Sequence, residues 1–178
     1  IKHVFKISPI QNVVSLAVES ISKLTKLLPD FDVSKVNTLI HCTQTPTGYL
    51  PGDGFRIHAA AGLNKECTVI DINNGCAGFV LSLSLALSSN ELFGNILITT
   101  SDAYSTIMRN SSRSTQAIFS DGASATYLSF NNLRSSRILG YDSFSDGESR
   151  SSLEIESTSG ELFMNGPAVY LFTQSVVE

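Results

Sequence analysis

Ile72 to Leu87 reads INNGCAGFVLSLSLAL, and this stretch decides how the rest of the chain is organised. It follows the β-rich run Thr68–Asn73 and precedes a second such run, Asn95–Ser101. Its second half alternates apolar and polar residues with a period of two, which on its own favours a strand. The run continues from Gly75 to Ser89, however, well beyond the roughly five or six residues of an ordinary strand, so we predict a helix. Because it is apolar nearly all round, we expect a central helix buried between layers.

Helix-like and strand-like segments alternate along the rest of the chain. Ser8 and Pro9 fit a helix start, and apolar residues then recur on one helical face as far as Leu28. The Pro- and Gly-rich segment 45–54 is typical of a loop, and the Ser-, Glu- and Gly-rich segment 143–161 predicts a long surface loop. This alternation predicts an α/β protein with helices on the faces of a sheet. Further strands are expected at Asn37–Thr43, Ala125–Ser129 and Arg137–Asp142, and a last helix from Gly166.

The composition is that of an ordinary globular domain. The chain has 178 residues, of which 42% are hydrophobic and 16% charged, and its formal net charge is −4; one compact domain is expected. Scattered Lys and Arg argue against nucleic acid and anionic membranes as partners, and no apolar run is long enough to span a bilayer. Three cysteines without CxxC or HExxH spacing argue against a metal site and favour a reducing, cytoplasmic location. Because the chain begins at Ile1, without methionine, we expect a piece of a longer protein.

Cys76 is the candidate nucleophile, because it follows a strand and lies in the first turn of the expected helix. Free backbone N–H groups and the positive end of the helix dipole favour a thiolate there, and the same groups can hold an oxyanion. Gly75 and Gly78 remove side chains, which would let an acyl group approach closely. The alternative is a packing role, since cysteine is among the residue types most often buried. We interpret Cys42 and Cys67, which lie at no such junction, as packing residues.

The segment Asn74–Phe79 resembles the active-site segment of the β-ketoacyl-acyl-carrier-protein synthase III family, in the thiolase superfamily. The resemblance covers nearly the whole chain in order and spacing, apart from 143–161. It implies a thiolase-like half fold, with a mixed five-stranded-type sheet, a buried central helix and helices on the faces. Residues 1–178 would form its N-terminal domain, with the second half absent. The other stretches that carry the resemblance are 17–51, NILITTSDAYS (95–105), RSTQAIFSDGASATYLS (113–129) and ELFMNGPAVYLFTQSVVE (161–178).

The resemblance implies an acyltransferase that acts by Claisen condensation. Cys76 would accept an acyl group from acyl-CoA, and the enolate of malonyl-acyl carrier protein would then attack the acyl-enzyme. Arg113 would lie against the CoA adenine, Leu50 would reach into the acyl tunnel of a partner subunit, and Phe119 would line the acyl pocket. Each of these three residues also has an ordinary structural interpretation. The family's dimer pairs the strand that leads into the cysteine, here Thr68–Asn73, so a homodimer is expected. No cofactor is implied beyond acyl-CoA as a substrate.

Other interpretations stay open. The family's decarboxylating histidine and asparagine have no counterpart with matching surroundings at His3, His41 or His58, so the chain is expected not to condense by itself. A non-catalytic acyl-carrier-protein-binding or dimerisation module of the same fold would fit that absence. A cysteine hydrolase of unrelated fold would need a histidine near Cys76 in the sequence, and none is present.

Overall fold

A computed structural model describes residues 4–130, 139–155 and 158–176 of the 178-residue chain. They group into two compact units. The sheet unit comprises Ile7–Ala103 and Gly122–Leu139, and the hairpin unit comprises Ile1–Lys6, Tyr104–Asp121 and Gly140–Glu178. No helix among the described residues is both long and apolar enough to cross a membrane.

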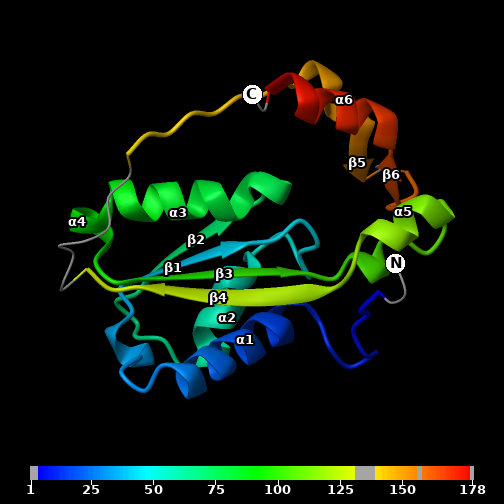
Figure 1. Ribbon diagram of the computed structural model, residues 1–178. Helices are drawn as coiled ribbons and strands as arrows, with labels where there is room; N and C mark the ends of the chain where they lie inside the picture. The colour runs from blue at the N-terminus through cyan, green and yellow to red at the C-terminus, as the bar shows by residue number, and fades with distance from the viewer. Residues whose placement is uncertain (1–3, 131–138, 156–157, 177–178) are drawn as a thin grey trace. The chain divides into compact units, whose positions relative to one another are not determined.

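The sheet unit contains a four-stranded mixed sheet with the strand order β2-β1-β3-β4 (Figure 1). Strand β1 (Thr38–Cys42) is central and pairs in parallel with β2 (Thr68–Ile72) and with β3 (Ile96–Asp102). Strand β4 (Gly122–Leu128) pairs antiparallel with β3. The mixed sheet is therefore confirmed, with four strands among the described residues. The carboxyl ends of the three parallel strands meet at one edge, where α/β proteins commonly place their functional groups.

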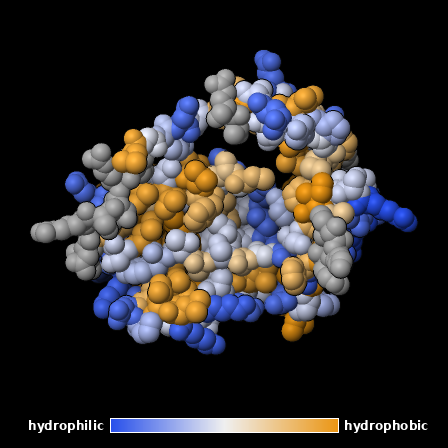
Figure 2. Space-filling view, in the orientation of Figure 1, coloured by the Kyte–Doolittle hydropathy of each residue, from blue (hydrophilic) through white to orange (hydrophobic). Residues whose placement is uncertain are grey.

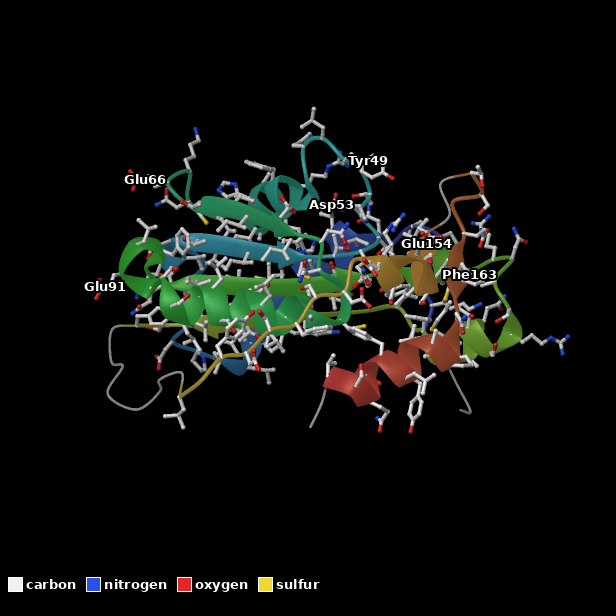
Figure 3. The ribbon with its side chains drawn as sticks, turned by 90° about the horizontal axis from the view of Figure 1, so that it is seen from above. Tyr49, Asp53, Glu66, Glu91, Glu154 and Phe163 are labelled. Atoms are coloured by element: carbon white, nitrogen blue, oxygen red, sulfur yellow. The ribbon has the colours of Figure 1, made fainter. Side chains whose placement is uncertain are left out.

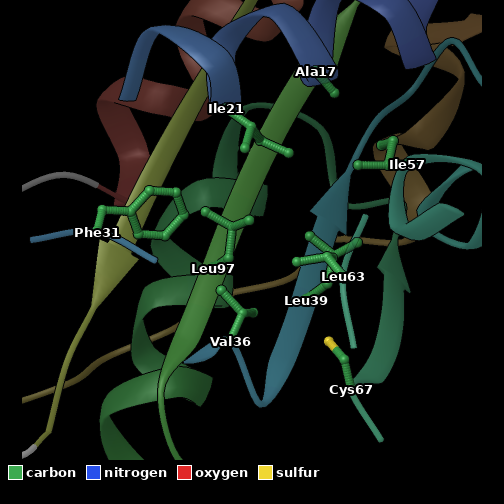
Figure 4. Packing of buried hydrophobic residues seen from close by; sticks show 9 residues of the cluster. All are labelled: Ala17, Ile21, Phe31, Val36, Leu39, Ile57, Leu63, Cys67 and Leu97. Carbon is green, nitrogen blue, oxygen red and sulfur yellow. The ribbon is translucent and has the colours of Figure 1, made fainter. Parts of the chain in front are cut away.

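Helices α1 (Val13–Leu27) and α2 (Asp53–Ala61) cover one face of this sheet (Figure 1). The cap of α1 is Asn12, whose side chain and that of Ser15 each accept a hydrogen bond from the other's backbone N–H. The expected start at Ser8 and Pro9 is therefore too early, because this capping box satisfies the first-turn donors later in the chain. Figure 4 shows the core beneath these helices, formed by Ala17, Ile21, Phe31, Val36, Leu39, Ile57, Leu63, Cys67 and Leu97.

Helix α3 (Gly78–Ser88) covers the other face and confirms the helix expected from the opening stretch. Only Gly78, Ser82 and Ala86, four residues apart, are buried, and the hydroxyl of Ser82 donates to the Gly78 carbonyl oxygen at 2.7 Å. The opposite side is not covered, since Phe79 is 37% and Val80 57% exposed. Figure 2 shows hydrophobic side chains gathered over this helix. Among the described residues the sheet covers one side of α3, and the second covering layer that the sequence predicts is not seen there. A four-residue helix, α4 (Asn90–Phe93), follows.

The hairpin unit contains α5 (Arg113–Ile118), the antiparallel pair β5 (Leu153–Ile155) and β6 (Leu162–Met164), and α6 (Gly166–Val176). The last helix begins where the sequence predicts it. The long loop expected over 143–161 is wrong in part, because the 3-10 helix Glu148–Ser152 and β5 lie within it. The strand expected at 137–142 is not formed by residues 139–142, and residues 137–138 lie outside the described part.

Candidate active site

Cys76 lies at the junction of β2 and α3, as the sequence indicates. It is the middle residue of the 3-10 turn Gly75–Ala77, which begins three residues after β2 ends and leads directly into α3. The thiol is exposed, whereas Cys42 and Cys67 are buried. Burial also raises the pKa of the thiols of Cys42 and Cys67, which keeps them protonated and unreactive. Cys76 is therefore the one cysteine of this chain that a substrate can reach.

The two glycines beside Cys76 serve packing and backbone geometry, which corrects the expectation that they clear space for a substrate. A Cβ atom on Gly78 would lie 2.1 Å from the Sγ atom of Cys42, so only glycine lets α3 begin this close to the end of β1. Gly75 has a φ angle of +54°, in the left-handed region, and a Cβ atom there would lie 2.8 Å from Nε2 of Gln44. Both missing side chains would point into the protein.

The start of α3 is also a place where an oxyanion can bind. Its N-terminal cap residue, Ala77, offers no side-chain hydrogen bond to the first turn. The backbone N–H of Gly78 already donates to the carbonyl oxygen of Gly75, and Asn74 makes no side-chain cap to the 3-10 turn, so an incoming carbonyl oxygen would meet the backbone N–H groups of the turn Gly75–Ala77. Together with the exposed thiol of Cys76, this arrangement suits attack on a thioester carbonyl.

The segment that follows β1 is tied to the end of β3 by one carboxylate. The Oδ1 atom of Asp102 accepts hydrogen bonds from the backbone N–H groups of Gln44 at 2.7 Å and Thr45 at 3.1 Å. It also accepts from the hydroxyls of Thr43 and Thr45, both at 3.1 Å. Burial raises the pKa of Asp102, while these hydrogen bonds oppose the rise. This cluster has no local signal in the sequence, because its hydrogen bonds join residues 57 to 59 positions apart.

Both histidines of the sheet unit have structural surroundings, as expected. His41 is fully buried in β1, and its Nδ1 atom lies 3.0 Å from Oγ1 of Thr99. Burial lowers its pKa, and its Nε2 atom has no hydrogen-bond partner among the described residues. The Nε2 atom of His58 lies 2.8 Å from the carbonyl oxygen of Asn64, just after α2. Neither His41 nor His58 is therefore a candidate general base for Cys76. His3 lies outside the described residues.

Leu50 projects from an anchored loop of the sheet unit. Leu50 is 92% and Tyr49 96% exposed. The loop is fixed below them by Asp53, whose buried carboxylate accepts a hydrogen bond from the backbone N–H of Thr47 at 2.7 Å and another from its hydroxyl. Figure 3 shows Tyr49 at the outer edge of this loop and Asp53 nearer the strands. A large apolar side chain held outwards in this way is suited to contact another molecule.

Arg113 and Phe119 belong to the hairpin unit. Arg113 is the first residue of α5 and is exposed, whereas the ring of Phe119 packs against Tyr104 with 4.6 Å between the ring centroids. A cleft of about 330 Å³ opens beside α5, and Ser112 and Thr115 of that segment line it together with Glu161 and Met164. The carboxylate of Glu161 is held by Asn110, through its backbone N–H at 3.2 Å and its side-chain amide at 3.1 Å. Phe119 does not line this cleft.

Comparison with known proteins finds a family model that matches the segment around Cys76 and relatives that match most of the chain. The family model of 3-oxoacyl-[acyl-carrier-protein (ACP)] synthase III matches residues 70–147. The chain is 34% identical to beta-ketoacyl-[acyl-carrier-protein] synthase III 2 of Staphylococcus epidermidis over 74% of its own length and 40% of that protein. It is 29% identical to beta-ketoacyl-[acyl-carrier-protein] synthase III of Rickettsia bellii over 82% of its length and 45% of that protein.

A solved structure agrees with the fold. The crystal structure of a 3-oxoacyl-(acyl-carrier-protein) synthase III superposes with a TM-score of 0.88 and 25% identity, covering 97% of this chain and 58% of that chain. Against the two curated relatives above, the chain spans less than half of their length.

Proposed function

The chain belongs to the 3-oxoacyl-[acyl-carrier-protein] synthase III family of the thiolase superfamily, and from that premise we propose that it supplies the acyl-accepting cysteine of a condensing acyltransferase in fatty-acid biosynthesis. The observation that supports this most is the exposed thiol of Cys76 at the start of α3, inside the segment that matches the family model. The substrates would be acyl-CoA and malonyl-acyl carrier protein.

In the first half-reaction the thiolate of Cys76 attacks the thioester carbonyl of acyl-CoA. The carbonyl oxygen becomes an oxyanion, which the backbone N–H of Cys76 in the 3-10 turn before α3 stabilises. The bond to the CoA sulfur then breaks, CoA leaves and takes up a proton, and the acyl group stays on Cys76 as a new thioester. In the second half-reaction malonyl-acyl carrier protein loses CO₂, and its enolate carbon attacks that thioester and releases the Cys76 thiolate.

Selective alkylation tests the first half-reaction. We expect iodoacetamide to modify Cys76 at least about tenfold faster than Cys42 or Cys67, because only Cys76 is exposed and burial raises the pKa of the other two thiols. The rate at each cysteine is measured by digestion and mass spectrometry over a series of pH values. Three thiols that react equally slowly would contradict the enzyme and favour the non-catalytic binding or dimerisation module.

We also propose a homodimer that pairs β2 with β2 of a second copy. Among the described strands β2 is the edge strand beside β1, and its residues are exposed or half-buried. An unpaired strand edge can add a strand from a partner, and a two-fold axis makes that pairing antiparallel. Leu50, exposed on its loop, would then be available to the partner's acyl tunnel.

Sedimentation velocity tests the dimer. The chain is expected to sediment at twice its own mass, and Thr68→Lys, which places like charges along the paired edge, should shift it towards the monomer. Ser22→Lys adds the same charge at an exposed position of α1 and should leave the dimer unchanged. A wild-type monomer at the highest concentration reached would contradict the dimer.

A further inference from the structure

We propose that Asp102, acting through Gln44, is a positioning residue that holds the turn bearing Cys76. The inference rests on the proposed function for its catalytic consequence, but its structural content stands on contacts within the sheet unit. Asp102 itself lies at the end of β3, and the segment that it binds follows β1. The turn that it would position follows β2. The proposed contacts therefore link the ends of three neighbouring strands, β3, β1 and β2, at one edge of the sheet.

The first link joins Asp102 to the segment Thr43–Thr45. Four donors converge on its Oδ1 atom: two backbone N–H groups and two threonine hydroxyls, at 2.7 to 3.1 Å. A neutral acceptor would bind so many donors more weakly than a carboxylate does. The hydroxyl of Thr45 also accepts from the backbone N–H of Ala103 at 2.8 Å, which closes the cluster back onto the end of β3. The backbone of Gln44 is therefore fixed on both sides.

The second link joins Gln44 to the turn. Its side-chain amide lies over Gly75, so close that a Cβ atom there would meet Nε2 at 2.8 Å and both Cδ and Oε1 at 3.1 Å. Gly75 is the residue immediately before Cys76 and carries the left-handed φ angle that directs the chain into the 3-10 turn. Because Asp102 holds the backbone of Gln44, the Gln44 side chain that lies over Gly75 limits where Gly75, and with it Cys76, can lie.

A third contact joins the end of β1 to Gly78, just after the turn that bears Cys76. Cys42, the last residue of β1, packs its Sγ atom against Gly78, the first residue of α3. Cys76 therefore lies between two glycines that contact the same segment: Gly75, next to it, contacts Gln44, and Gly78, two residues further on, contacts Cys42. Because Cys76 itself is exposed, its position is set by these neighbours rather than by packing of its own side chain. Small displacements of a nucleophile cost large factors in rate, which is why a positioning residue matters here.

Hydrogen exchange on the 178-residue chain tests the proposal without any substrate. For Asp102→Ala and for Gln44→Ala we expect peptides spanning residues 75–78 to exchange about tenfold faster or more, through the Gly78 amide that donates to the Gly75 carbonyl oxygen, because the turn opens locally once its support is lost. Asp102→Asn keeps an acceptor oxygen without the charge and should restore only part of the protection. Asp32→Asn is the matched control, since that carboxylate accepts from Ser34 and contacts neither Gln44 nor the turn. Unchanged exchange at 75–78 in both alanine variants would overturn the proposal.

Acylation of Cys76 by acyl-CoA adds the catalytic readout. If Asp102 positions the nucleophile, Asp102→Ala lowers the maximal single-turnover rate about tenfold or more, while the acyl-CoA concentration that gives half of that rate is unchanged. A rise in that concentration with an unchanged maximal rate would overturn the positioning role. A wild-type chain that is not acylated, but whose variants exchange faster at 75–78, would refute the proposed function and leave the positioning of the turn intact.

Discussion

Replacing Cys76 with alanine is expected to abolish transfer of an acyl group from acyl-CoA to the chain. The reason is chemical: the thioester forms on the Sγ atom of Cys76, and Cys42 and Cys67 are buried with raised thiol pKa values. Intact-mass spectrometry after incubation with acyl-CoA should show one added acyl group on the wild-type chain and none on the variant. Cys67→Ala is the matched control and should be acylated like the wild type. Acyl transfer that persists in Cys76→Ala would assign the nucleophile to another residue.

The same chain is expected to stop at the acyl-enzyme. When malonyl-acyl carrier protein is added, we expect no β-ketoacyl product, because decarboxylation in this family needs a histidine and an asparagine in matching surroundings. The two described histidines have other roles: His41 is buried beside Thr99, and His58 contacts the carbonyl oxygen of Asn64. Chromatography of the products from the acylated chain decides this point. A β-ketoacyl product would show that the chain completes the condensation with residues other than these.

Local pattern was sufficient to predict the junction that carries Cys76. The β-rich runs around residues 38–42, 68–72 and 96–102 form strands, and the length of the stretch after Gly75 correctly outweighed its alternation of apolar and polar residues. The exposed thiol of Cys76 follows from that junction. Such features depend on neighbours a few positions away, which a sequence displays directly.

Contacts between distant segments could not be predicted in the same way. Glycine is ambiguous in a sequence, because it serves equally an open approach, a left-handed turn or close packing. Only the structure shows that Gly78 faces Cys42 and that Gln44 covers Gly75. The cluster around Asp102 is similar, since its donors lie 57 to 59 positions earlier in the chain. An apolar helix such as α3 predicts a covering layer but does not say which part of a protein supplies it.

Gly78→Ala is expected to have the largest effect on the stability of the sheet unit. The new Cβ atom would lie 2.1 Å from Sγ of Cys42, so α3 and the end of β1 must move apart or the backbone must distort. Overpacking of a buried contact costs about 1–3 kcal/mol of unfolding free energy. Urea unfolding of the two chains measures the difference. Gly122→Ala is the matched control, because a Cβ atom on Gly122 has no neighbour within 4 Å and should change stability by less than about 1 kcal/mol.

A double variant separates this specific clash from a general intolerance of α3 to substitution. Cys42→Ala removes the Sγ atom, and the remaining Cβ atom would lie 3.6 Å from a Cβ atom on residue 78, which is an ordinary contact distance. Cys42→Ala with Gly78→Ala should therefore recover about 1–3 kcal/mol relative to the sum of the two single variants. A double variant no more stable than that sum would refute the direct contact. The same contact fixes the start of α3, two residues after Cys76. We therefore expect Gly78→Ala to slow acylation of Cys76, and the double variant to restore the acylation rate together with stability.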